Sequence, residues 1–282
     1  MAGTTPKARA IGAELRKVRK AAGFTLRRLA VELGTSHASV SRWETGARTP
    51  RPHDVAAYLA RVGAGADLRE ELVELAQDPD GSHWLSVGMP DQQRQVATLL
   101  EIEREAARIT TVSPLLIPGL LQTAEYARSI MNLAGVPTDE IDTRVAVRVG
   151  RRDVIAGRNP AQFRAYVGEA ALRTIIGGPA AMSYQLEQLV QFGQWDNVEL
   201  QVVPLRADWH PGMEGLFSIA SFGDGRDPVV HLENRISGLF LHETAEVSAY
   251  EEALGRMDEV ALSPAESTKF IVGIIEEAEA TV

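Results

Sequence analysis

The stretch GTSHASVSRWETGARTP, residues 34–50, carries polar side chains whose chemistry is hydrogen bonding rather than core packing. On a helix, positions 37, 38, 41 and 42 lie opposite the apolar residues Val40 and Trp43. From that face, Arg42 can donate two hydrogen bonds to guanine O6 and N7, and His37 can donate or accept one. The stretch therefore suits contact with a polar macromolecular surface.

Residues elsewhere offer little for catalysis. HETAE, residues 242–246, has Glu246 where a zinc-protease motif needs its second histidine ligand. In HLE, His231 and Glu233 share one face of an expected strand, where a hydrogen-bonded cross-strand pair is the simpler alternative to an acid/base pair. The chain has no cysteine, and it has no GxSxG or P-loop motif. We therefore expect no enzyme activity, no catalytic residue, no metal and no cofactor.

Short helices must position the polar stretch. Residues 11–22 carry one apolar stripe at helical spacing, and Gly23 ends that helix. Thr25 and Ser36 are expected N-caps of the second and third helices, and Gly34 separates these two. A fourth helix over 53–63 and a fifth over 66–77 follow. The fourth turns these residues inward: Val55, Tyr58, Leu59 and Val62.

The junction between the second and third helices has the spacing of a helix-turn-helix. Ala30 is a small residue where two helices would cross closely, and Gly34 suits a turn that needs positive φ. Val40 is a branched apolar residue that can anchor the following helix. Such a unit places its second helix in the DNA major groove, with its first residues toward the base edges.

Charge is segregated along the 282 residues. Residues 1–52 contain eleven Lys and Arg against three Glu, a balance of +8, within a chain of net charge −9. The remainder thus carries −17. This asymmetry favours a polyanion-binding head on an acidic body.

The segment GAELRKVRKAAGFTLRRLAVELGTSHASVSRWETG resembles the Xre/Cro-type helix-turn-helix family of bacterial and phage regulators, over residues 10–62. The resemblance implies binding to double-stranded DNA, with base contacts from His37, Ala38 and Arg42. It also implies a structural ion pair between Arg19 and Glu44, which keeps Glu44 out of the DNA site.

Further polar residues of the head stand near helix starts or turns, where phosphates would pass. The phosphate-contact candidates are Thr25, Ser36, Ser39, Arg48 and Arg51.

The body alternates helical and β-rich segments, so we expect an α+β chain: an all-α N-terminal domain and a larger α+β C-terminal domain with a mostly antiparallel sheet. We expect the domain of the head to span 1–77, a Gly/Pro/Asp-rich linker 78–91 and the body 92–282. Within the body, helices are expected at 92–110, 122–134, 138–156, 179–193, 245–260 and 264–280. Strands are expected around 162–169, 197–204, 215–222, 228–234 and 237–242.

Several body segments, among them EREAARI, PGLLQTAEYAR, GGPAAMSYQLEQL and ALSPAES, resemble the C-terminal domain of actinobacterial WhiJ-like regulators. That resemblance covers most of residues 85–280. It implies an antitoxin-like role in which the body binds a small BldB-related or toxin-like protein.

Two groups of body residues are candidates for partner binding. In PGLLQT, Leu120 and Leu121, which precede Gln122, must be buried, either within the body or by a partner. Arg148, Arg151 and Arg152 lie with Arg144 on one helical face. These arginines suit an anion, an acidic partner or internal ion pairs.

Together these features predict a sequence-specific DNA-binding transcriptional regulator that forms a homodimer and whose body binds a small partner protein or effector. Two alternatives remain open: an antitoxin-like protein that mainly sequesters a small partner, and a small-ligand sensor. The chain has no signal-peptide core and no apolar run near the ~20 residues that span a bilayer. We therefore expect no membrane association and a cytoplasmic location, at the nucleoid when bound to DNA.

Overall fold

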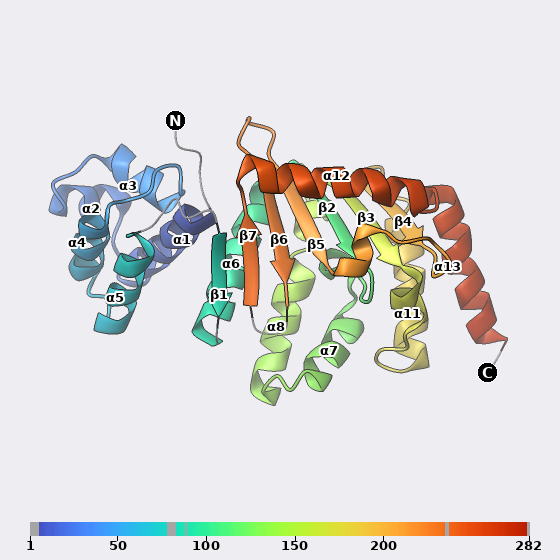
Figure 1. Cartoon of the computed structure of the whole chain (residues 1–282). Coiled ribbons are helices and arrows are strands. Elements are labelled where there is room, and N and C mark those ends of the chain that lie inside the picture. Colours follow the sequence, from blue (N-terminus) through green and yellow to red (C-terminus); the bar gives the residue numbers. More distant parts are fainter. Residues whose placement is uncertain (1–5, 78–82, 88, 235–236, 281–282) are drawn as a thin grey trace. The chain divides into compact units, whose positions relative to one another are not determined.

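The computed structural model describes residues 6–77, 83–87, 89–234 and 237–280. The chain divides into two compact units, which we describe separately (Figure 1). Unit 1 comprises residues 1–105 and 222–247, and unit 2 comprises 106–221 and 248–282. The fold class is α+β, as the sequence predicts. None of the described helices is long and apolar enough to cross a membrane.

Unit 1 begins with a helical head of five helices. They are α1 (Pro6–Ala21), α2 (Leu26–Glu32), α3 (His37–Glu44), α4 (Pro52–Val62) and α5 (Ala66–Leu75). Each overlaps a helix that the apolar periodicity or the N-caps predict, although α1 begins at Pro6, ahead of the expected 11–22. The core residues of the head come from all five helices: Ile11, Leu15, Leu29, Ala30, Val40, Trp43, Val55, Tyr58, Leu59, Val62 and Leu72.

Helix α1 passes very close to the end of α3. A Cβ atom added to Gly12 would lie 2.4 Å from the carbonyl oxygen of Trp43 and 2.9 Å from that of Glu44. Glycine at this position therefore lets the two backbones touch.

This close approach makes Gly12→Ala destabilising, although alanine is the better helix former. We expect the free energy of unfolding to fall by about 1–3 kcal/mol, as for other overpacked sites. Gly255→Ala in α12 (Thr244–Val260) is the matched control, because nothing lies within 4 Å of its added Cβ. That variant should be neutral or stabilising in urea denaturation. Equal effects of both substitutions would contradict the close packing of α1 on α3.

The rest of unit 1 contains β1 (His83–Val87), α6 (Met89–Glu105), β6 (Val229–Glu233) and β7 (Ser237–Leu241). β7 pairs antiparallel with both β1 and β6. Strand β1 falls inside the interval 78–91 that we expected to be a linker. The Gly, Pro and Asp residues behind that expectation flank the segment HWLSV, whose Trp and Val favour a strand. The domain boundaries themselves stay a prediction.

Unit 2 is built on four strands in the order β5-β2-β3-β4: β2 (Arg108–Ser113), β3 (Gln162–Gly168), β4 (Val198–Val203) and β5 (Phe217–Ser221). β2, β3 and β4 run parallel, whereas β5 is antiparallel to β2. The sheet is therefore mixed, with helical crossovers joining the parallel strands. Of the described strand pairs, β1/β7, β6/β7 and β2/β5 are antiparallel, and β2/β3 and β3/β4 are parallel. The expected helix over 92–110 was wrong at its end, since α6 stops at Glu105 and the β-branched RITTVS forms β2.

Helices cover both faces of this sheet. α7 (Ala124–Leu133), α8 (Thr138–Gly150) and α9 (Asp153–Ala156) connect β2 to β3, with the short helix η1 (Gly119–Leu121) before them. α10 (Glu169–Arg173) and α11 (Pro179–Phe192) connect β3 to β4, and η2 (Pro211–Glu214) precedes β5. Phe163, Ala165 and Val167 of β3 join the core that α11 and α13 (Pro264–Glu279) complete.

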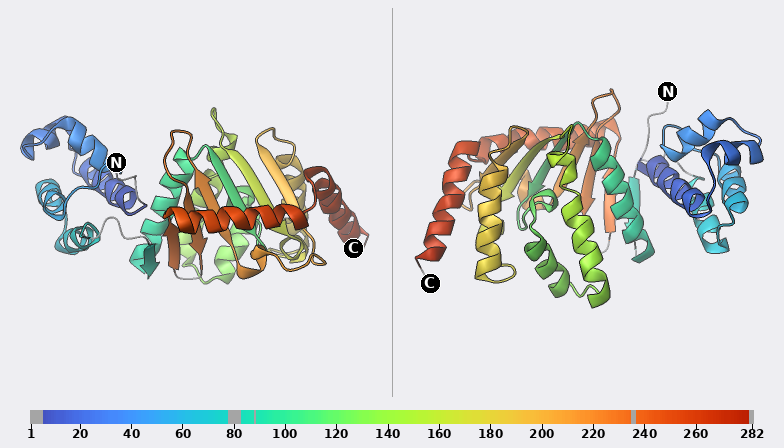
Figure 2. Two further views of the ribbon diagram at one scale, coloured as in Figure 1. Left: turned by 45° about the horizontal axis from the view of Figure 1, so that its top comes forward. Right: turned by 180° about the vertical axis from the view of Figure 1, so that it is seen from behind.

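The alternate residues of β3 face α12, which crosses the strands of unit 2 in the left view of Figure 2. The hydroxyl of Tyr166 donates to Asp258 Oδ1 at 2.7 Å, and Arg164 forms an ion pair with the same carboxylate. The two faces of β3 are thus sorted into an apolar side and a polar side.

Candidate nucleic-acid interface

Local hydrogen bonds hold the start of α2 and the turn between α2 and α3. Thr25 Oγ1 accepts from the backbone N–H of Arg28 at 3.2 Å, and Ser36 Oγ accepts from that of Ser39 at 3.0 Å. Each therefore caps its helix, as predicted. Gly34 has φ +62°, in the left-handed region that glycine adopts without strain. The N–H of Thr35 then donates back to the carbonyl of Ala30 at 3.0 Å.

Helix α3 is anchored on one side and exposed on the other. Val40 and Trp43 are buried against α1, α2 and α4, with exposed fractions of 0% and 7%. His37, Ala38 and Arg42 are exposed on the opposite side, as the sequence predicts for base-contacting residues. Their placement is compatible with DNA contact, and their base-reading roles stay predictions.

Arg19 and Glu44, the predicted ion pair, lie together at the end of α3. Arg19 Nε and Nη2 donate to the two carboxylate oxygens of Glu44 at 2.6 and 2.8 Å, and the carboxylate is buried. Arg19 also donates to the carbonyl of Phe24 at 2.7 Å. A bidentate pair of this kind fixes α1, α3 and the start of the α2 segment to one another.

The buried hydroxyl of Tyr58 completes this network. It lies 2.6 Å from Glu44 Oε1 and 3.0 Å from the carbonyl oxygen of Leu15. Sequence reasoning placed Tyr58 in the core but missed its polar role. The available signal was that a buried tyrosine hydroxyl needs a hydrogen-bond partner.

The network also shifts proton affinities. The hydrogen bond to Glu44 raises the pKa of Arg19, and burial together with the bond to Glu44 raises the pKa of Tyr58. Both shifts favour the protonated forms of Arg19 and Tyr58, so Arg19 stays charged and Tyr58 stays neutral across physiological pH. The positive charge of Arg19 therefore balances the negative charge of Glu44 within the head, which reduces the repulsion of Glu44 toward a polyanion.

Several arginine side chains of the head are exposed and unpaired among the described residues. Within the described part of the head, residues 6–77, the side chains of four exposed arginines make no ion pair or hydrogen bond: Arg27, Arg42, Arg48 and Arg51. Arg28, by contrast, donates to Glu32 at 3.0 Å. Arg27 on α2 was not among the phosphate-contact candidates predicted from the sequence. The available signal was its basic side chain at the start of a helix.

The phosphate candidates with hydroxyls differ in availability. Thr25 and Ser36 are exposed, and their hydroxyl oxygens already accept one cap bond each. Ser39 is half-buried, and its Oγ lies 2.9 Å from that of Ser36. Each hydroxyl retains capacity for a further hydrogen bond, since a hydroxyl both donates and accepts.

The residues of unit 2 predicted to bind a partner are also brought together, but inside the fold. Leu120, Leu121 and Gln122 have exposed fractions of 3%, 0% and 3%. The two leucines belong to the core of unit 2, and Gln122 Nε2 donates to the carbonyl of Ile117 at 2.8 Å. These three residues are therefore core, and their assignment to a partner surface is corrected.

The neighbouring arginines hold this segment in place. Arg152 donates to the carbonyl of Gln122 at 2.5 Å, and Arg148 Nη1 donates to Gln122 Oε1 at 3.4 Å. Arg151 Nη1 lies 3.2 Å from the position of a Cβ added to Gly119. Burial lowers the pKa of Arg152. All three are half-buried, so the arrangement is an internal network; binding of an anion or partner there stays a prediction.

The histidine motifs do not assemble a metal site among the described residues, where no three His, Asp or Glu side chains could share an ion. His231 is buried in β6 and stacks on Phe240 of β7, with ring centroids 4.6 Å apart.

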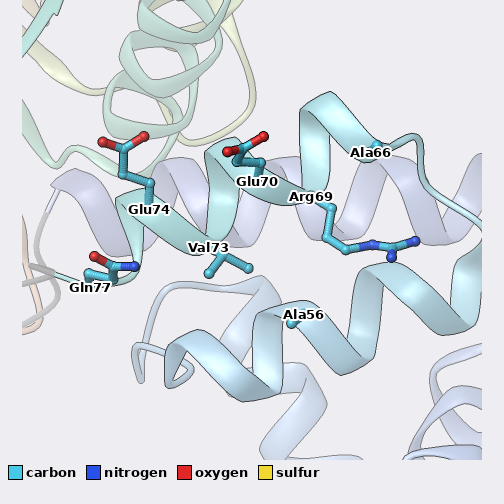
Figure 3. Close-up of a pocket in the computed structure, with 7 residues that line it drawn as sticks. All are labelled: Ala56, Ala66, Arg69, Glu70, Val73, Glu74 and Gln77. Carbon is cyan, nitrogen blue, oxygen red and sulfur yellow. The ribbon is translucent and has the colours of Figure 1, made fainter.

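A depression of about 580 Å³ lies between α4 and α5. Figure 3 shows Val73 pointing toward Ala56 of α4, whereas Glu70 and Glu74 point away on the other side of α5. Arg69, Glu70 and Glu74 are among the residues that line it, and a lining with so many charged residues is atypical of a small-molecule site.

The fold of the head and its exposed face are those of a helix-turn-helix domain, the kind of domain that binds DNA, and a helix-turn-helix domain model matches residues 10–72. A second family model, described as a domain of unknown function (DUF5753), matches residues 96–272. The chain therefore belongs to the DUF5753 family. No curated protein matches it.

Proposed function

We propose that this protein is a sequence-specific transcriptional regulator whose α3 helix reads DNA in the major groove. The observation that carries the proposal is the exposed face of α3, where the Arg42 side chain has no partner among the described residues and its helix is anchored by buried side chains. Its guanidinium can form the bidentate contact to guanine that is the commonest specific contact in such complexes. His37 and Ala38 occupy the neighbouring base-reading positions.

Arg48 and Arg51 supply phosphate contacts that are independent of sequence. Each arginine removed should lower the affinity for operator and random DNA alike and reduce the salt slope of log K by about 0.9. Titrations of Arg48→Ala and Arg51→Ala over a range of salt concentrations measure this slope. Arg28→Ala is the matched control, because Arg28 is already paired with Glu32. If Arg28→Ala changes the slope as much as the other two, phosphates do not pass where we place them.

We further propose that the regulator acts as a homodimer. One head of this size presents a single α3 helix, and specific helix-turn-helix binding normally uses two half-sites about one DNA turn apart. The operator would then be nearly palindromic. We assign the body no catalytic role, because its motifs lack the ligand and nucleophile patterns of known enzyme sites.

A second candidate is an antitoxin-like function, in which the body sequesters a small WhiJ-system partner of the BldB-related or toxin-like kind. Exposed apolar side chains favour it: Leu115 is 68%, Leu205 66%, and Trp209 and Met213 57% exposed. They follow the carboxyl ends of β2 and β4, where Gly212 packs near Val112. If these side chains form one contiguous apolar patch, that patch would be typical of an interaction site.

Native purification followed by intact-complex mass spectrometry tests this candidate. We expect a stoichiometric small protein with the wild-type chain and its loss in Trp209→Ser. Recovery of the wild-type chain without such a protein, or retention of the protein by Trp209→Ser, argues against partner binding at this end of the sheet. A co-purifying metabolite would favour the ligand-sensor alternative instead.

A further inference from the structure

Arg9, near the start of α1, is a buried cation with few hydrogen bonds. Its exposed fraction is 4%, and its Nη1 lies 3.4 Å from Glu105 Oε2 at the end of α6. Its Nε and Nη2 atoms are buried and have no hydrogen-bond partner among the described residues. A buried guanidinium normally has most of its donors satisfied, so this position is costly.

The loop after β5 closes over this cation. The Arg9 guanidinium lies 4.3 Å from the ring centroid of Phe222, and the Arg226 guanidinium lies 4.5 Å from the same ring. Arg226 Nη1 is also 2.5 Å from Glu105 Oε2. One ring and one carboxylate are therefore shared by two arginines. We call these four residues the Arg9 clasp: Arg9, Glu105, Phe222 and Arg226.

The clasp adjoins the end of the recognition helix. A Cβ added to Gly46, which follows α3, would lie 2.9 Å from both the N and Cα atoms of Arg9. Gly12, one turn further along α1, packs still more closely, since its added Cβ would lie 2.4 Å from the carbonyl oxygen of Trp43. A movement of the first turn of α1 must therefore displace the end of α3.

The balance of forces makes the clasp easy to open. Burial lowers the pKa of Arg9 to about 10, so it is still charged at neutral pH and its desolvation opposes closure. The carboxylate of Glu105 and the face of Phe222 favour closure. When the loop withdraws, water satisfies the two orphaned donors, which offsets much of the lost attraction.

We propose that the Arg9 clasp is a releasable link between the helix-turn-helix head and residues 222–226, so that the position of this loop sets how firmly α1 and α3 are held. A partner that draws the loop away would loosen the head, and one that covers the loop would fix it. The existence of the link is independent of DNA binding, whereas its regulatory use rests on the proposed function.

Two substitutions with opposite expected signs test the link. Glu105→Gln keeps the side-chain shape but removes the shared negative charge, so the clasp should open more often. Arg9→Met removes the buried charge and keeps an apolar chain of similar length, so the clasp should stay closed. The readout is hydrogen exchange of the α1 amides of residues 10–15, the first that the helix itself protects.

We expect exchange at these amides to rise at least tenfold in Glu105→Gln and to fall below wild type in Arg9→Met. Asp142→Asn, which removes the Arg128–Asp142 pair of unit 2, is the control and should leave these amides unchanged. Faster exchange in both clasp variants would show that Arg9 simply stabilises the head. No change in either would show that the link does not hold α1. Both results overturn the proposal.

NMR relaxation separates release of the head from local fraying. In the wild type, the amides of α2–α5 and those of β6 and β7 should share one rotational correlation time. In Glu105→Gln the value for α2–α5 should become shorter. Equal values in Glu105→Gln would contradict the proposal even if DNA binding is intact, and shorter values would support it even if the protein binds no operator.

Discussion

Arg42→Ala should lower operator affinity by roughly 2–6 kcal/mol in the dimer, since each bidentate contact contributes about 1–3 kcal/mol of discrimination. Arg42 is exposed on α3, so its removal leaves the head folded. Affinity for random duplexes should fall far less, because non-specific binding depends on the phosphate contacts. Titration of an operator and a scrambled duplex over a range of salt concentrations measures both affinities and their salt slopes.

The specificity ratio is the informative quantity here. Arg28→Ala removes a cation from the same head without touching the α3 face, so the ratio should be retained in this control. If Arg42→Ala weakens both duplexes equally and lowers the salt slope, Arg42 is a phosphate contact and the proposed docking is wrong.

Glu44→Ala should lower the free energy of unfolding by about 3–5 kcal/mol, the effect of breaking a buried ion pair by removing one partner. The substitution leaves the charge of Arg19 largely buried and takes away the 2.6 Å partner of the Tyr58 hydroxyl. Urea denaturation of the full chain, followed by hydrogen exchange of the amides of the head, measures the loss.

A double substitution distinguishes the charge from the packing. Arg19→Met with Glu44→Leu removes both charges and keeps apolar volume, so most of the stability should return. If the double variant is as unstable as Glu44→Ala, the contribution of these residues is shape rather than charge.

Most of the head could be predicted from the sequence because its helices are short, amphipathic and punctuated by caps. Thr25 and Ser36 cap the helices expected of them, and Gly34 adopts the positive φ that the spacing from Ala30 to Val40 requires. Local signals of this kind depend on neighbours within four residues, so the sequence displays them directly.

The errors arise where distant contacts decide the structure. RITTVS continues an amphipathic pattern, yet its β-branched residues pair with β3 and β5 as strand β2. The sequence shows that Leu120 and Leu121 must be buried, but not whether the body or a partner buries them. Only their packing against α11 and the strands of unit 2 places them in the core. The Arg9 clasp joins residues more than 200 positions apart along the chain, which no local periodicity reports.

Selection of bound duplexes from a randomised pool tests the central claim most directly. With the purified full chain, the account predicts enrichment of one nearly palindromic sequence, with a guanine in each half-site and half-site centres about one helical turn apart. The same selection with Arg42→Ala should lose the preference for that guanine. Retention of duplexes without any shared sequence would contradict sequence-specific DNA binding by this protein.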